Sequence, residues 1–255
     1  MYPVLFTVFG FEIHSFGVMI LIAFLAALWF ARRRAPRYGL APEDVNDVGF
    51  WALLAGIFGA RIAFILTELP HFIANPHDLL RWQFQGLTSF GGIIGGALAV
   101  ILWCRIRRKP VTAMIDVAAP PLLLGHAIGR VGCLLNGCCY GGACDLPWGI
   151  AVANEPGLYH PAQIYDSLLN LLAMAFLLRV EVTRKLAPGQ VAALFFVLHG
   201  VARFVYEFWR AGTTSEYLGP LPITMAQAMA LVLAMFGAAL FGIFGRRAAG
   251  EVVAT

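Results

Sequence analysis

Two arginines set in apolar sequence are the residues of this chain best suited to chemistry. Arg130 ends one apolar run, and Arg203 lies inside another, one helical turn before Glu207. An ionised side chain beside membrane-grade hydrophobic sequence is costly and usually marks a functional site. Because the planar guanidinium binds two phosphate oxygens at once, the arginines indicate a cationic pocket for an anionic lipid headgroup. A structural ion pair, such as Arg203 with Glu207 at i, i+4, or a snorkelling side chain is the alternative.

Four of the five cysteines also lie close together, at Cys133, Cys138, Cys139 and Cys144. Their C-x4-C-C-x4-C spacing does not match the common zinc or iron–sulfur patterns, so we predict no metal site. One or two structural disulfides are the leading interpretation, because disulfides persist outside the cytoplasm. Free buried thiols, and a metal or redox function, are the alternatives.

The elements that must position these residues are membrane helices. The chain of 255 residues is 60% hydrophobic and only 13% charged, and its mean hydropathy is +0.77. A soluble domain could not cover its surface with so few polar groups. The net charge of +4 comes from basic clusters between apolar runs, which is typical of membrane orientation rather than of nucleic-acid binding. We predict a single polytopic membrane domain over residues 1–255, without a cleavable signal peptide.

Seven apolar segments are long enough to cross a bilayer as helices, if flanking residues snorkel at the shorter ones. The predicted fold is therefore an all-α integral membrane protein with about seven transmembrane helices. The segments are Ile13–Ala31, Val48–Leu66, Phe90–Cys104, Val111–Gly129, Pro161–Arg179, Gln190–Trp209 and Leu221–Phe244.

The basic clusters follow the first, third, fifth and seventh segments. By the positive-inside rule these connections are cytoplasmic, which places the N-terminus outside and the C-terminus in the cytoplasm. The outer-face loops then cover about 69–89 and 131–160. Arg81, Trp82 and Phe84 in the first loop suggest a segment lying on the membrane surface. The clusters comprise Arg32, Arg33, Arg34, Arg37, Arg105, Arg107, Arg108, Lys109, Arg179, Arg184, Lys185, Arg246 and Arg247.

Polar and small residues within the segments indicate how they pack. Gln163, Asp166 and Asn170 give the fifth segment a polar side, which we expect to face the bundle interior. Gly91 and Gly92 begin a small-residue pattern that lets the third segment approach a neighbouring helix closely. Consecutive prolines at 120 and 121 should kink the fourth segment.

The run from Gly129 to Gly137, followed by Gly141, resembles the G-R-[IV]-G-[NC]-x-x-N-G-x-x-x-G motif of bacterial prolipoprotein diacylglyceryl transferases. His160–Tyr165 is similar to the family's H-P-[ST]-Q-[LI]-Y motif. Arg203–Arg210 is similar to its R-F-x-x-E-F-x-R motif. The resemblance extends to the first three segments, at Ile13–Gly17, Gly59–Arg61 and Gly91–Gly95.

This resemblance implies an enzyme of the bacterial cytoplasmic (inner) membrane that needs no cofactor. It would transfer the diacylglyceryl group of phosphatidylglycerol to the lipobox cysteine of a prolipoprotein signal peptide, forming a thioether and releasing glycerol phosphate. A membrane thiol–disulfide redox protein using the four clustered cysteines is the alternative from another class. A lipid-binding or transport protein would use the same arginines without chemistry.

The resemblance also implies roles for individual residues. Arg130 and Arg203 would hold the phosphate, as their match to the family's arginines suggests. Phe90 and Phe16 stand where the family often has histidine and tyrosine, so a histidine base at 90 is excluded. His199 becomes the best candidate to take the thiol proton, with Glu207 and His14 as fallbacks and an unassisted mechanism still open. Substrate contacts are expected at Arg61, His14, Asn136, Gly91, Gly92, Gly141, Gln163 and Arg210.

Overall fold

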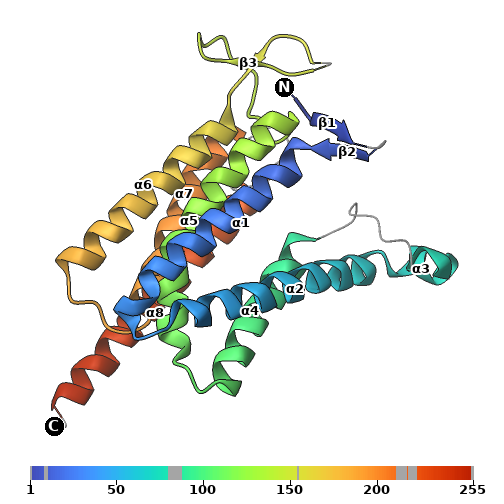
Figure 1. The fold of residues 1–255 in the computed structure, drawn as a ribbon. Helices are drawn as coiled ribbons and strands as arrows, with labels where there is room; N and C mark the ends of the chain where they lie inside the picture. Colours follow the sequence, from blue (N-terminus) through green and yellow to red (C-terminus); the bar gives the residue numbers. More distant parts are fainter. Residues whose placement is uncertain are drawn as a thin grey trace. The chain divides into compact units, whose positions relative to one another are not determined.

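The computed structural model describes residues 2–8, 11–79, 88–153, 155–210, 217 and 223–253. Its contacts divide the chain into two units: Met1–Ala31 with Ile115–Thr255, and Arg32–Met114. Both are built from helices (Figure 1). The described strands form two short antiparallel hairpins, β1 (Val4–Val8) with β2 (Phe11–His14), and β3 (Ile150–Ala151) with β4 (Leu158–Tyr159).

Each of the seven predicted segments coincides with a helix, and five helices are long and apolar enough to cross a membrane. These five are α1, α2, α5, α7 and α8. The apolar part of α4 is shorter, and α6 carries a polar stripe. The protein is therefore a helical multi-pass membrane protein. The bounds are α1 Ser15–Arg34, α2 Pro42–Thr67, α4 Ser89–Ile106, α5 Val111–Asn136, α6 Ala162–Thr183, α7 Gln190–Arg210 and α8 Met225–Val253.

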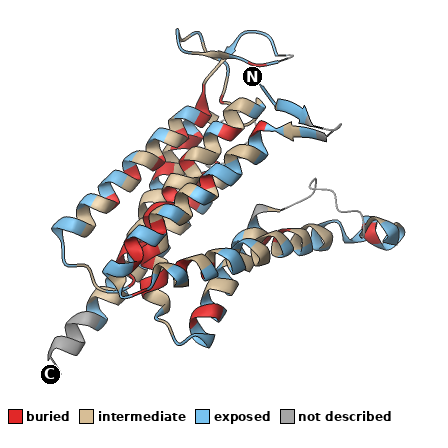
Figure 2. Cartoon of the chain, viewed as in Figure 1, coloured by how far each residue is buried: buried red, intermediate tan, exposed pale blue. Residues whose placement is uncertain are grey.

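The larger unit is organised around α5, α6 and α7, which run side by side (Figure 1). Buried apolar residues of these helices form its core cluster, while outward positions are exposed (Figure 2). The exposed positions of α1 and α8 include many large apolar side chains, which is the pattern of helices facing lipid. The core cluster comprises Ala119, Leu123, Ala173, Leu177, Val191 and Ala192.

A buried carboxylate fixes the start of α7 against α5. Asp116, which is 1% exposed, accepts backbone hydrogen bonds from Gly189 at 2.6 Å and from Ala192 at 2.8 Å. These amides belong to the first turn of a helix, where no intrahelical acceptor exists. A negative charge there also complements the helix dipole. Asp116 therefore caps the first turn of α7.

α5 extends seven residues beyond the predicted end at Gly129, so the predicted start of the following loop at residue 131 is wrong. The helix ends in a left-handed turn at Gly137, where φ is +76°. The amide of Gly137 donates to Leu134 O, and that of Cys138 donates to Cys133 O at 3.1 Å. This is the Schellman pattern, which favours glycine at the left-handed position. Arg130 and Cys133 consequently share one helix, and α5 continues through Pro120 and Pro121.

The smaller unit pairs α2 with α4 through glycine contacts. A Cβ on Gly91 would overlap the backbone of Gly59, and one on Gly95 would overlap that of Ala55. Close approach of this kind requires small residues. α3 (Leu69–Ala74) and the 3-10 helix η2 (Pro76–Leu79) follow α2, and a further 3-10 turn covers Ala35–Tyr38. Residues 80–87, including Arg81, Trp82 and Phe84, lie outside the described residues.

Candidate active site

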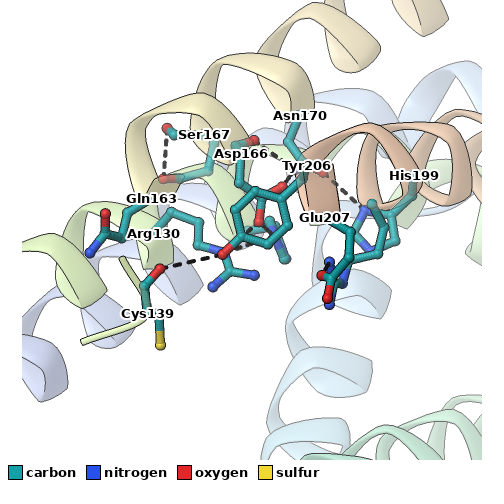
Figure 3. A network of polar contacts seen from close by, with 12 residues as sticks. Arg130, Cys139, Gln163, Asp166, Ser167, Asn170, His199, Tyr206 and Glu207 are labelled. Atoms are coloured by element: carbon teal, nitrogen blue, oxygen red, sulfur yellow. Dashed lines mark hydrogen bonds and ion pairs between the residues drawn. The ribbon is translucent and has the colours of Figure 1, made fainter. Parts of the chain in front are cut away.

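Polar residues of α5, α6 and α7 converge inside the larger unit (Figure 3). On α5 and α6 they are spaced three, four or seven residues apart, and on α7 Arg203, Tyr206 and Glu207 follow His199 by four, seven and eight residues, so each set occupies one side of its helix. The predicted polar side of α6 is confirmed, since its polar residues are almost completely buried. The three sets are His126, Arg130 and Cys133 on α5; Gln163, Asp166 and Asn170 on α6; and His199, Arg203, Tyr206 and Glu207 on α7.

Asp166 is the central acceptor of this network. Its Oδ2 lies 2.5 Å from Arg130 Nε and 3.1 Å from His126 Nε2. Its Oδ1 accepts a hydrogen bond from Asn170 Nδ2 at 2.7 Å. The carboxylate side chain is only 2% exposed, so its charge needs these donors to remain ionised inside the bundle. Asp166 therefore fixes Arg130 through Nε and leaves both Nη groups for other acceptors.

His199 is held by Asn170 from the neighbouring helix. Its Nδ1 lies 2.9 Å from Asn170 Oδ1, and its ring stacks on Phe195. The Asn170 amide nitrogen already donates to Asp166, so its oxygen must accept from the histidine. The proton of a neutral His199 therefore lies on Nδ1, and Nε2 carries the lone pair. The residue thus has the tautomer that a base would need.

Tyr206 is surrounded by three guanidinium groups. The Cζ atoms of Arg130, Arg203 and Arg210 lie 5.1, 5.0 and 5.9 Å from the centre of its ring. Tyr206 is fully buried, so the aromatic face stabilises cations that are shielded from bulk water. The ion pair of Arg203 with Glu207, which the sequence offered as the structural alternative, is present. Arg130 is paired with Asp166 and Arg203 with Glu207, and Arg210 lines the same cavity as Glu155.

The cysteines are free thiols, so the predicted disulfides are wrong for this structure. The Sγ atoms of Cys133, Cys138 and Cys139 instead lie within 4.8 Å of one another. Cys144 is not a member of this cluster. Burial and the hydrogen bond with Cys139 raise the pKa of the Cys138 thiol. A hydrogen bond with Cys133 and burial raise the pKa of Cys139. Both groups are therefore protonated thiols at neutral pH.

A cavity of about 520 Å³ lies next to two of these thiols. Near it, Gln163 is 1% exposed and donates from Nε2 to Cys138 O at 2.6 Å. Its buried Oε1 has no hydrogen-bond partner among the described residues. An unsatisfied buried oxygen is costly, and it can accept a hydrogen bond from a bound molecule. The cavity is lined by Gly137, Cys138, Cys139, Tyr140, Glu155, Tyr159 and Arg210.

Other residues predicted to contact substrate also have partners within the protein. His14 is half exposed and lies 3.9 Å from Glu12. The side chain of Asn136 hydrogen-bonds Cys138. Gly141 packs the loop against the end of α7, because a Cβ there would lie 2.8 Å from His160 Cβ and would overlap the backbone of Trp209.

Three predicted residues belong to the smaller unit, where each packs within that unit. Arg61 lies over the rings of Phe64 and Phe72 and donates to Asp78 O at 3.4 Å. Gly91 and Gly92 face α2, so their role in the structure is helix packing. Phe90 is 67% exposed and Phe16 is 40% exposed.

Sequence reasoning missed two residues of the network, Tyr206 and His126. It also missed that Asp166 pairs with Arg130. A signal for Tyr206 does exist, because it lies three residues after Arg203 and four before Arg210 on one helical face. No comparable signal identifies Asp166 as the partner of Arg130, since the two residues are on different helices.

Apolar helices that enclose two arginines paired with buried carboxylates define a membrane protein with a charged site inside its bundle. Comparison with known proteins gives the family. The profile of the prolipoprotein diacylglyceryl transferases matches residues 3–243, and the chain belongs to this family. It is thus a diacylglyceryl transferase enzyme.

Full-length relatives agree. The chain is 34% identical over 260 residues to the phosphatidylglycerol–prolipoprotein diacylglyceryl transferase of Gloeobacter violaceus, covering 98% of this chain and 95% of that protein. It is 34% identical over 215 residues to the Clostridium tetani transferase, covering 82% and 86%. It is 33% identical over 254 residues to that of Methylobacillus flagellatus, covering 96% and 97%.

Proposed function

We propose that the donor is phosphatidylglycerol, that the acceptor is the lipobox cysteine of a prolipoprotein, and that the reaction takes place at the arginines around Tyr206. The grouping of three guanidinium groups at 5.0–5.9 Å from one buried ring carries this proposal. Like charges do not gather in an apolar bundle unless counter-charges or a ligand offset them. A phosphodiester offers the oxygen atoms that guanidinium groups bind through paired hydrogen bonds.

Arg130 and Arg203 hold the phosphate in this mechanism. Each is fixed by one carboxylate, Arg130 by Asp166 and Arg203 by Glu207. Their remaining N–H donors bind the phosphate oxygens, on which negative charge grows as the bond to the glyceryl carbon breaks. Donors that are already in place before the reaction stabilise this charge without reorganisation. Arg210, on the same face of α7 and at the cavity, extends the positive charge toward the headgroup.

The acceptor thiol must lose its proton as it attacks. The sulfur forms a bond to the glyceryl carbon, the carbon–oxygen bond to phosphate breaks, and glycerol phosphate leaves with the bonding electrons. His199 Nε2 takes the thiol proton, because Asn170 holds the other ring nitrogen protonated. Gln163 Oε1, the buried acceptor, receives a hydroxyl hydrogen bond from the headgroup. Phosphatidylglycerol offers such hydroxyls on its terminal glycerol.

The protein crosses the bacterial cytoplasmic membrane seven times, with its N-terminus outside and its C-terminus in the cytoplasm. The basic clusters support this orientation. So does the hydrogen bond from the Tyr2 amide to Leu135 O at 2.9 Å, which joins the start of the chain to the end of α5 that precedes the thiol loop. A reporter that fluoresces only in the cytoplasm, fused after residue 255, should fluoresce. A dark but full-length fusion would contradict the orientation.

Purified protein incubated with phosphatidylglycerol and a lipobox peptide tests the reaction. The peptide cysteine should gain the mass of one diacylglyceryl group, and glycerol phosphate should appear in equal amount. Phosphatidylethanolamine, which lacks the glycerol hydroxyls, is the matched donor control and should react far more slowly. Folded protein that modifies no peptide would refute the proposal.

A further inference from the structure

Three thiols lie together beside the arginine site, and the transfer reaction described above does not use them. The Sγ atoms of Cys133, Cys138 and Cys139 are within 4.8 Å of one another, and those of Cys138 and Cys139 are 3.2 Å apart. We infer that these cysteines form a binding site for one thiophilic metal ion, zinc or copper(I). This inference does not depend on the proposed substrates.

The sulfur separations fit such an ion. A tetrahedral zinc ion with zinc–sulfur bonds of about 2.3 Å holds its sulfur ligands roughly 3.8 Å apart. The separations of the three thiols, from 3.2 Å to at most 4.8 Å, span this value. Side-chain rotations that change the sulfur separations by up to about 1 Å would therefore bring the sulfurs to the ligand geometry. Thiolates select soft ions such as zinc and copper(I) over magnesium or calcium.

The backbone holds the three cysteines in place. The turn at Gly137 returns the Cys138 amide to the carbonyl of Cys133, 3.1 Å away, and so carries Cys138 and Cys139 back to the end of α5. Gln163 from α6 donates to Cys138 O, and Tyr206 from α7 donates to Cys139 O at 3.5 Å. Contacts that orient the ligands in this way raise the affinity of a metal site.

The surroundings suit a charged metal–thiolate group. Arg130 precedes Cys133 by three residues on α5, so its positive charge is on the same helical face as the thiolates. The cavity lined by Cys138 and Cys139 gives an ion a route to the sulfurs. Three protein ligands leave a fourth position for water or another small ligand, as in open zinc sites.

Cobalt(II) is a spectroscopic probe for the site. The full-length protein in detergent, reduced and stripped with a chelator, is titrated with cobalt and then with zinc. We expect one ion per chain, a sulfur-to-cobalt charge-transfer band, and loss of that band as zinc displaces cobalt. Cys133→Ser, Cys138→Ser and Cys139→Ser should each weaken binding by about tenfold or more. Cys144→Ser and Cys104→Ser, outside the cluster, are the matched controls and should bind like the unsubstituted protein.

Several results would overturn the inference. One is the absence of a charge-transfer band at micromolar protein and cobalt. The others are a Cys144→Ser variant that weakens cobalt binding as much as the cluster variants do, and a triple serine variant that binds cobalt fully. A second measurement needs no variant: zinc should protect the three clustered thiols, but not Cys144, from alkylation followed by peptide mass spectrometry. Uniform protection of all the cysteines would equally refute it.

Discussion

Replacing Asp166 by asparagine tests whether this carboxylate fixes Arg130 for catalysis. The substitution keeps the shape of the side chain but removes the charge that Arg130 Nε contacts at 2.5 Å. Hydrogen bonds to charged groups contribute about 1.5–3 kcal/mol. Since about 1.4 kcal/mol corresponds to a factor of ten in rate, Asp166→Asn should slow transfer by about 10- to 150-fold.

The same substitution also affects stability, because it leaves a guanidinium without its counter-charge in a largely buried place. A loss on the order of 3 kcal/mol is expected for a broken buried pair. The transfer assay must therefore be scored per folded molecule, with the folded fraction measured by size-exclusion chromatography and thermal unfolding in the same detergent. The mass of the lipidated peptide gives the rate.

Asp116→Asn is the matched control for Asp166→Asn. Asp116 is equally buried and also accepts two close hydrogen bonds, but its partners are backbone amides at the start of α7. Losing this cap should cost about 1–2 kcal/mol of stability. The rate per folded molecule should stay within about twofold of the unsubstituted protein, because the change is independent of the arginine site. Equal rates for Asp166→Asn and Asp116→Asn would refute the positioning role of Asp166.

Four further substitutions or treatments examine the site. Arg130→Lys should lower the transfer rate at least about tenfold, because lysine cannot form two parallel bonds to a phosphate; an unchanged rate would contradict its role in holding the phosphate. His199→Ala should slow transfer, and His126→Ala should slow it too, because His126 contacts Asp166 at 3.1 Å. Added imidazole should restore the rate of His199→Ala if His199 is the base. A rate that imidazole does not restore would argue against His199 as the base. Burial raises the pKa of the Cys138 thiol. In metal-free protein its alkylation by iodoacetamide should therefore be slower than that of glutathione at pH 8, and the alkylation rate should still increase above pH 9. A rate equal to that of glutathione would contradict the burial. Gly137→Ala, at φ +76°, should lower the free energy of unfolding by about 1 kcal/mol. Gly157 also has a left-handed backbone, at φ +88°, and a Cβ there would meet open space. Gly157→Ala therefore measures the cost of the left-handed conformation alone.

The helices were predictable from the sequence, because an apolar run of about 20 residues leaves the chain few other structures in lipid. Arg203 and Glu207 were predictable as a pair for a similar reason, since residues four apart share one helical face. The end of α5 was predicted too early because Gly132 and Cys133 look like loop residues. In the structure the helix continues to Asn136, and the left-handed turn at Gly137 ends it.

Contacts between helices could not be predicted in this way. Asp166 and Arg130 are 36 residues apart, and their meeting depends on the rotation of α6 relative to α5, which hydropathy does not determine. The thiol cluster likewise depends on one backbone turn at Gly137, which the cysteine spacing does not reveal. The place of His126 depends on helix packing for the same reason, and the bundle brings its ring to 5.0 Å from that of His199.

The carboxylates explain how the arginines can stay in the bundle without a ligand. A guanidinium in an apolar setting needs a counter-charge, and Asp166 and Glu207, each 2% exposed, supply it permanently. If a phosphate alone held the arginines, they would have to move whenever the headgroup left. Each carboxylate contacts only one nitrogen of its arginine in these ion pairs. The carboxylate thus holds the guanidinium in a fixed orientation, and the other N–H donors keep that orientation through the reaction cycle. The two ion pairs are therefore part of the preorganisation that such a transfer needs, and neutralising either carboxylate should affect the rate more than the binding of the lipid.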